Sequence, residues 1–197
     1  QPDEPVTSVD CAVWVQDEHG RNGMVLIEVK LAEGGFSTCN GLTSRGNRSP
    51  DVCASLKKMF SRPDECYLTH PYRATRDRRY WAIFEKRYGS LKAAFPGSEQ
   101  DGSCPFAGHF QQPMRNHALA LGLVQSGFCD FAYFGLLHHD YNPDVVPHWD
   151  QYCEMVAEPQ MLFKLNASEL VDAAPHSGWW TKWAHYMRNR YALSLNN

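Results

Sequence analysis

The stretch GMVLIEVKL, Gly23 to Leu31, is typical of a buried β-strand because apolar and β-branched residues dominate it. The valine-rich segment VTSVDCAVWV, Val6 to Val15, predicts a second strand, and the polar, glycine-containing segment between the two predicts a turn. Together they predict a β-hairpin. Its second strand nevertheless ends with the charged residues Glu28 and Lys30, which packing alone does not require.

Side chains alternate across a strand, so the odd and even positions of this hairpin lie on opposite faces. The odd positions are all apolar, and we expect that face to pack on a core: Val9, Cys11, Val13, Val15, Val25, Ile27, Val29 and Leu31. The even positions hold every polar group, gathered at one end: Asp10, Ala12, Trp14, Met24, Leu26, Glu28 and Lys30.

A hairpin symmetric about His19 places Asp10 opposite Glu28, with Cβ atoms about 5 Å apart. Two carboxylates at that separation repel each other unless a positive charge lies between them. Lys30 is one candidate and Mg²⁺ is a better one, because Mg²⁺ binds one or two carboxylates together with water and phosphate oxygens. Asp10, Glu28 and the backbone carbonyl of Val29 would supply such a set of ligands. The alternative is an ordinary hairpin with one solvated face.

The rest of the chain alternates turns with periodic apolar segments. We expect strands at 128–139 and 161–165, and helices at 52–60, 78–95, 110–127, 148–158, 167–174 and 179–193. The order of strand, strand, insertion, helix and strand, followed mostly by helices, predicts an α/β domain. Trp179, Trp180, Trp183 and Tyr186 recur at helical spacing, which favours packing in the core or at an interface over base stacking.

Composition narrows the possible function classes. A chain of 197 residues with 43% hydrophobic content fits one domain, 1–197. No apolar run approaches the roughly 18 residues of a membrane-spanning helix, and the first residues do not resemble a signal peptide. We therefore expect a cytoplasmic protein. The net charge of −3 excludes a uniformly basic surface, yet RATRDRRYW, 73–81, supplies Arg76, Arg78 and Arg79 for a local phosphate-binding patch. A solvated charged segment is the alternative.

Four of the seven cysteines, Cys39, Cys53, Cys66 and Cys104, lie in or beside the polar segment 31–104. This segment is poor in core-forming residues, so a zinc ion or an iron–sulfur cluster held by the four thiolates would stabilise it. The segment contains no C-x-x-C motif, however, and scattered reduced cysteines are the simpler interpretation.

The hairpin resembles the active-site hairpin of the PD-(D/E)XK nuclease superfamily, in which an aspartate on one strand precedes (Asp/Glu)-x-Lys on the next. In this chain the pattern is Asp10 followed by Glu28-Val29-Lys30. The segment CPFAGHFQQPMRNHALA resembles the glutamine-bearing helix of RecB-type nucleases and restriction-endonuclease-related bacterial proteins.

The resemblance implies a restriction-endonuclease-like fold, with a mixed central sheet flanked by helices. It also implies Mg²⁺-dependent (or Mn²⁺-dependent) phosphodiester hydrolysis, with Asp10 and Glu28 as metal ligands and Lys30 acting on the attacking water. Gln112, chosen over Gln111 by the resemblance of the segment, would contact that water or the surroundings of Lys30. Arg115 would meet a phosphate, with a surface ion pair as the alternative.

Two departures from the family pattern concern the ends of the hairpin. We expect the helix and strand that normally precede the aspartate strand to be missing from this chain or supplied from elsewhere, and the insertion 31–104 is longer than the usual connection.

Three functions follow. The first is a nuclease that cleaves nucleic acid, with DNA as the expected substrate and either endo- or exonuclease action. An oligomer or a partner subunit is compatible with this function. The second is an inactive nuclease-like module that binds nucleic acid. The third is a metal-stabilised structural or interaction protein in which the cysteines matter and the hairpin does not.

Overall fold

The computed structural model describes residues 8–69, 78–98, 102–174 and 178–193. Its centre is one four-stranded sheet in the order β1-β2-β3-β4. The strands are β1 (Cys11–Gln16), β2 (Asn22–Lys30), β3 (Phe131–His138) and β4 (Leu162–Asn166). β1 pairs antiparallel with β2, whereas β2, β3 and β4 run parallel, so the sheet is mixed. The predicted α/β class is confirmed.

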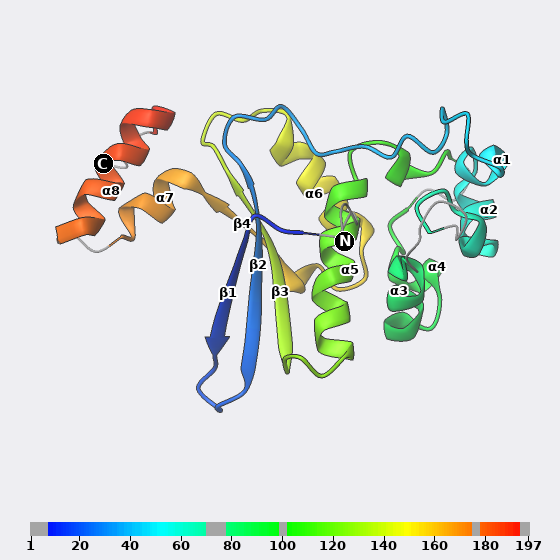
Figure 1. Ribbon diagram of the computed structural model, residues 1–197, viewed down its shortest axis with the longest axis horizontal. Helices are drawn as coiled ribbons and strands as arrows, with labels where there is room; N and C mark the ends of the chain where they lie inside the picture. The colour runs from blue at the N-terminus through cyan, green and yellow to red at the C-terminus, as the bar shows by residue number, and fades with distance from the viewer. Residues whose placement is uncertain (1–7, 70–77, 99–101, 175–177, 194–197) are drawn as a thin grey trace, which may run out of the picture.

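Helices surround this sheet (Figure 1). In chain order they are α1 (Pro50–Cys53), α2 (Leu56–Ser61), α3 (Tyr80–Tyr88), α4 (Leu91–Ala94), α5 (Gln111–Gln125), α6 (Val145–Met155), α7 (Ala167–Asp172) and α8 (Gly178–Tyr191). Short 3₁₀ turns lie at Pro63–Glu65, Pro105–Ala107 and Pro159–Met161. Figure 1 shows α5 running alongside β3, the short helices α1–α4 beyond it, and α7 and α8 on the other side of the sheet.

The hairpin has the register expected from its sequence. Cys11 pairs with Ile27 and Gln16 with Asn22, so the pairing is symmetric about residue 19. Asp17 closes the turn, because its Oδ1 accepts the backbone N–H groups of both His19 and Arg21 at 2.9 Å. The same symmetry brings Asp10, one residue before β1, opposite Glu28.

The expectation about the two faces of the hairpin is wrong in one respect. The even face of β2, not the odd face, meets the main core: Leu26 and Glu28 are each 2% exposed and Lys30 is 8% exposed. On the odd face, Ile27 and Val29 pack in a smaller cluster with α7 and α8. Val13 is 42% exposed. Parity separated the faces correctly, but an apolar face does not reveal which layer of helices will cover it.

The segment expected to be polar and poorly packed instead contributes to the main core. Trp81, Phe84 and Phe95 are buried there, and the rings of Phe84 and Phe95 lie 4.8 Å apart. Each of the two long helices predicted in this segment is interrupted. Ser55 caps α2 after α1 has ended, and Gly89 adopts φ 81° between α3 and α4, where a residue without Cβ meets no steric penalty.

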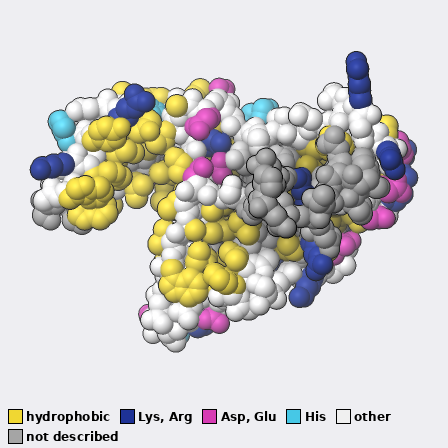
Figure 2. All heavy atoms as spheres, in the orientation of Figure 1, with side chains coloured by type: hydrophobic (Ala, Val, Ile, Leu, Met, Phe, Trp, Pro, Cys, Tyr) yellow, Lys and Arg dark blue, Asp and Glu magenta, His cyan; other side chains and the backbone are white. Residues whose placement is uncertain are grey.

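The aromatic stripe of α8 is only partly packed. Trp183 joins the smaller cluster beside α7, as expected. Trp179, Trp180 and Tyr186 are 64%, 45% and 60% exposed, so these three rings do not pack in the core, and packing at an interface stays a prediction. Figure 2 shows hydrophobic side chains gathered over α8 and over the sheet on this face of the molecule. No helix within the described residues combines the length and apolar character needed to cross a membrane.

His117, on the buried side of α5, makes stability depend on pH. Its Nδ1 lies 3.0 Å from the Tyr152 hydroxyl, while its Nε2 is buried without a partner among the described residues. Burial lowers the pKa of His117 from 6.5 to about 4. Between these values the unfolded chain binds a proton that the folded chain does not. Stability is therefore complete above pH 6.5 and is lost as the pH falls towards 4.

We predict that this residue accounts for a loss of about 3 kcal/mol in unfolding free energy between pH 7 and pH 4. Denaturant titrations of wild type and His117→Leu across that range measure it, because leucine cannot take up the proton. His185→Gln, on the exposed side of α8, serves as the control. If His117→Leu lost as much unfolding free energy as wild type between pH 7 and pH 4, the assignment of this loss to His117 would be contradicted.

Candidate functional site

Glu28 is a buried carboxylate surrounded by hydrogen-bond donors. Its Oε1 lies 3.1 Å from the Lys30 Nζ and also accepts a short hydrogen bond from the Gln112 Nε2. Its Oε2 accepts from the Asn116 Nδ2 at 2.8 Å. Two of these donors come from α5 and one from β2 itself. The glutamate therefore joins the sheet to the helix that packs on it.

The spacing of α5 explains why both amides reach the same carboxylate. Gln112 and Asn116 are four residues apart, so their side chains lie one above the other on one face of the helix. The Gln112 amide is held from its other end, because its Oε1 accepts the Ser37 N–H at 3.0 Å. This bond orients the amide so that Nε2, a donor, faces Glu28. Gln111 lies next to Gln112, and its side-chain amide is 3.1 Å from the Ser37 hydroxyl.

Asp10 lies across the hairpin from Glu28, on the outer side of β2. Its Oδ2 accepts the Val29 N–H at 2.8 Å. The N–H and C=O of one strand residue point to the same edge, so the Val29 carbonyl faces the side on which Asp10 lies. The structure thus brings Asp10, Glu28, Lys30 and Gln112 together at one end of the hairpin, with the Val29 carbonyl directed towards Asp10.

Burial and the positive charge of Lys30 shift the pKa of Glu28 in opposite directions. Burial raises the pKa of the Glu28 carboxyl above its ordinary value of 4.5, and the nearby Asp10 charge raises it further. The hydrogen bond and charge of Lys30, together with the Asn116 hydrogen bond, lower this pKa. Removing Lys30 would therefore favour the protonated, neutral form of Glu28, which binds cations poorly.

The donor set fits a hard cation. Asp10, Glu28 and the Val29 carbonyl offer oxygen ligands only, as Mg²⁺ prefers, and two protein carboxylates suffice when water and phosphate complete the coordination. Within the described residues there is no group of three or more His, Cys, Asp or Glu side chains arranged to hold a metal ion. A cation at Asp10 and Glu28 would therefore depend on non-protein ligands for the rest of its coordination.

Asn116 and Ser37 are the contacts that our sequence reasoning missed. Asn116 follows Gln112 by one helical turn, so the i, i+4 rule identifies it once Gln112 is placed. Ser37 lies 75 residues before Gln112 in an irregular loop, and no local pattern in the sequence predicts that contact.

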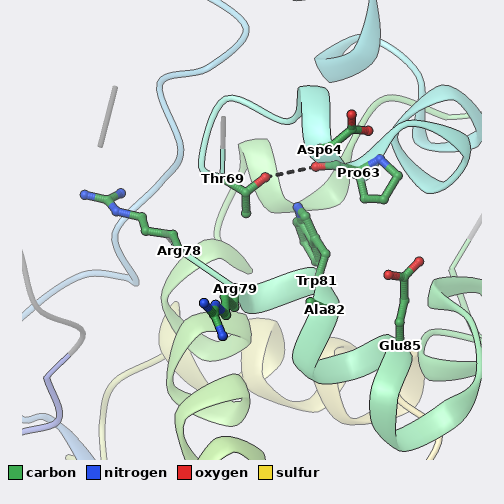
Figure 3. Close-up of a pocket in the computed structure, with 8 residues that line it drawn as sticks. All are labelled: Pro63, Asp64, Thr69, Arg78, Arg79, Trp81, Ala82 and Glu85. Atoms are coloured by element: carbon green, nitrogen blue, oxygen red, sulfur yellow. Dashed lines mark hydrogen bonds between the residues drawn. The ribbon is translucent and has the colours of Figure 1, made fainter. Parts of the chain in front are cut away.

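Two of the arginines expected to contact nucleic acid, Arg78 and Arg79, line a cavity that does not include Glu28. Arg76 lies outside the described residues. Arg78 and Arg79 line a cavity of about 230 Å³ together with Thr69, Trp81 and Glu85. Figure 3 shows Arg78 extending away from Trp81 and Glu85. None of the residues that line this cavity belongs to the Glu28 site.

Arg115 belongs to α5 and lies closer to the site. Its Nε is buried without a hydrogen-bond partner in the described part of the chain. With the Gln111 amide oxygen turned towards it, Arg115 Nη1 lies 3.2 Å from that oxygen. Among the described residues no carboxylate forms an ion pair with this guanidinium.

Three of the four cysteines named as metal ligands are buried close to one another. Cys53 helps to raise the pKa of Cys66, and both help to raise the pKa of Cys104. The Cys104 N–H donates to the Cys53 carbonyl at 3.3 Å. Cys39 is half-buried, and its Sγ accepts the Gly41 N–H at 3.3 Å. The described residues do not bring these thiols into the arrangement of a metal site, so zinc or iron–sulfur binding stays a prediction.

Comparison with models of protein families identifies a match to this chain. A sequence model described as the PD-(D/E)XK nuclease superfamily matches residues 85–193, which is more than half of the chain. The matched segment contains α5 with Gln112 and Asn116, and it excludes the hairpin that carries Asp10, Glu28 and Lys30. No curated protein and no solved structure matches the chain significantly.

Burial should make the clustered thiols slow to react. It raises the pKa of Cys104 to about 12 and raises the pKa values of Cys53 and Cys66, whereas Cys11 is exposed. Each added pKa unit lowers the reactive thiolate about tenfold. We predict that a disulfide reagent at pH 8 modifies Cys11 at least about 100-fold faster than Cys104, and faster than Cys53 and Cys66.

Denaturant should expose all seven thiols, and Cys11→Ser should remove the fast phase. Elemental analysis for zinc and iron separates protection by metal from protection by burial. If Cys53, Cys66 and Cys104 react as fast as Cys11 in the native protein, the predicted burial is contradicted.

Proposed function

Because the chain belongs to the PD-(D/E)XK nuclease superfamily, we propose that it is a metal-dependent nuclease that hydrolyses phosphodiester bonds, with Mg²⁺ as the cation and DNA as the substrate. Its mixed four-stranded sheet flanked by helices is consistent with a restriction-endonuclease-like fold.

The observation that carries the proposal is the convergence of Asp10, Glu28 and Lys30 at one end of the hairpin, with Lys30 Nζ 3.1 Å from Glu28 Oε1. The superfamily match rests on residues 85–193 and so does not depend on this motif. The motif and the match are therefore separate reasons for the same assignment.

In the proposed reaction Asp10, Glu28 and the Val29 carbonyl hold the cation. When bound, Mg²⁺ polarises the scissile phosphate and lowers the pKa of a coordinated water. Lys30 supplies a buried ammonium that orients the attacking water and offsets the negative charge that develops on the phosphate. Gln112 and Asn116 keep Glu28 in place during these events. Arg115, Arg76, Arg78 and Arg79 are proposed phosphate contacts.

One observation favours a second candidate, an inactive module that binds nucleic acid. Glu28 is 2% exposed and already accepts hydrogen bonds from three donors. In an inactive module these bonds would be permanent and the carboxylate would never reach a cation. Cleavage assays separate the two candidates directly.

The first test is a cleavage panel on single-stranded and duplex DNA and RNA, with Mg²⁺, Mn²⁺ or EDTA. We expect cleavage of DNA with either cation and none with EDTA. Binding of nucleic acid without cleavage under every cation condition would favour the inactive module.

We predict that Lys30→Ala and Asp10→Asn each lower the cleavage rate by about 10²–10⁴-fold, the usual contribution of a group that assists proton transfer and charge stabilisation. Circular dichroism should show that both variants remain folded. Lys164→Ala is the matched control, because Lys164 lies on β4 of the same sheet and pairs with Asp150 at 2.7 Å, away from the motif. Mg²⁺-dependent cleavage at the wild-type rate by Lys30→Ala would disprove the mechanism.

A further inference from the structure

Asn116 is buried on α5 and directs its amide at the proposed metal ligand. It is 2% exposed, and its Nδ2 donates to Glu28 Oε2 at 2.8 Å. Neighbouring residues of the same helix, including Met114, Ala118 and Leu121, are buried in the main core and fix the helix against the sheet. The amide therefore projects from a rigid position.

The two oxygens of Glu28 are occupied unequally. A carboxylate oxygen has about two acceptor directions. Lys30 and Gln112 both donate to Oε1 and fill its two directions. Among the described residues, Asn116 is the only donor to Oε2, which leaves one direction of that oxygen available.

We propose that Asn116 is a positioning residue that fixes the plane of the Glu28 carboxylate and presents Oε2 to the catalytic cation. This inference rests on the proposed function, and it adds a residue and an atom that the hairpin motif does not contain. The cation then binds the oxygen that Asn116 holds, while Lys30 and Gln112 keep the other oxygen in place.

Side-chain chemistry explains why an asparagine suits this position. Its amide donates without adding charge, so the negative charge of Glu28 remains available to the cation. Asparagine also has fewer rotatable bonds than glutamine and loses less conformational entropy when it is held. Gln112, the longer amide, needs the additional bond from Ser37 N–H to its Oε1 to be held. Asn116 reaches Glu28 directly from the helix.

The test replaces Asn116 with leucine, which has a similar shape and no donor. We predict that Mn²⁺ binding, measured by calorimetry without nucleic acid, weakens about 10–100-fold, the usual effect of removing a partner that orients a metal ligand. The kcat for DNA cleavage should fall at a fixed Mn²⁺ concentration. The KM for DNA should stay within about twofold, because a residue this deeply buried does not touch the substrate.

Gln125→Leu is the matched control. Gln125 lies on the same helix and donates to the Ile83 carbonyl at 2.8 Å, away from Glu28. We expect it to leave Mn²⁺ affinity unchanged, which separates a positioning effect from a general loosening of α5. Asn116→Ala, which only removes atoms, repeats the measurement if leucine disturbs folding.

A second measurement uses the wild-type protein. Adding Mg²⁺ should shift the NMR signal of the Asn116 side-chain amide and leave that of Gln125 in place. Mn²⁺ affinity within twofold of wild type in the Asn116 variants, or an Asn116 amide unmoved by saturating Mg²⁺, would overturn the inference alone. A wild-type protein that neither binds Mn²⁺ nor cleaves nucleic acid would overturn the proposed function as well.

Discussion

The buried carboxylate of Glu28 is the constraint around which this domain is arranged. Removing a carboxylate from water costs several kcal/mol, and each hydrogen bond to a charged group contributes about 1.5–3 kcal/mol. Three donors are therefore enough to offset the cost, while one would not be. Those donors come from β2 and α5. The helix must therefore lie against the even face of β2, with Gln112 and Asn116 facing the strand, or the charge would be buried alone.

The long connection between β2 and α5 supports the same arrangement. β2 and β3 are parallel neighbours, so the chain must leave the end of β2 and return before β3 begins. On the way it forms α1 to α4, whose aromatic residues pack behind α5. Phe84 lies edge-on to the His117 ring of α5, at a centroid distance of 5.2 Å. Ser37, in the same connection, orients Gln112. The insertion thus supports α5 from behind and positions one of its amides at the front.

Alternation predicts the two faces of the hairpin, and the register symmetric about His19, which is an assumption at the level of sequence, is the one observed. Asp10, Glu28 and Lys30 could therefore be placed at one end before any coordinates were known. The sequence does not reveal which face of the hairpin meets the main core, since both faces carry apolar residues and the choice depends on where distant helices pack. The breaks near Ser55 and Gly89 were missed because periodicity continues through them. Contacts across long separations, such as Ser37 with Gln112, have no local signature.

The arrangement of donors has a consequence for how a cation would enter. The ammonium of Lys30 already pairs with the buried Glu28 carboxylate, so the burial of Glu28 does not depend on a metal. This differs from structural zinc sites, in which folding and metal binding are the same event. A cation must instead attach to an oxygen whose position is already set, and it brings its remaining ligands as water and phosphate. Under the proposed function, affinity for the metal alone would be modest, and the phosphate of the substrate would complete the site. A preorganised but incomplete site of this kind would be fully coordinated only when nucleic acid is present.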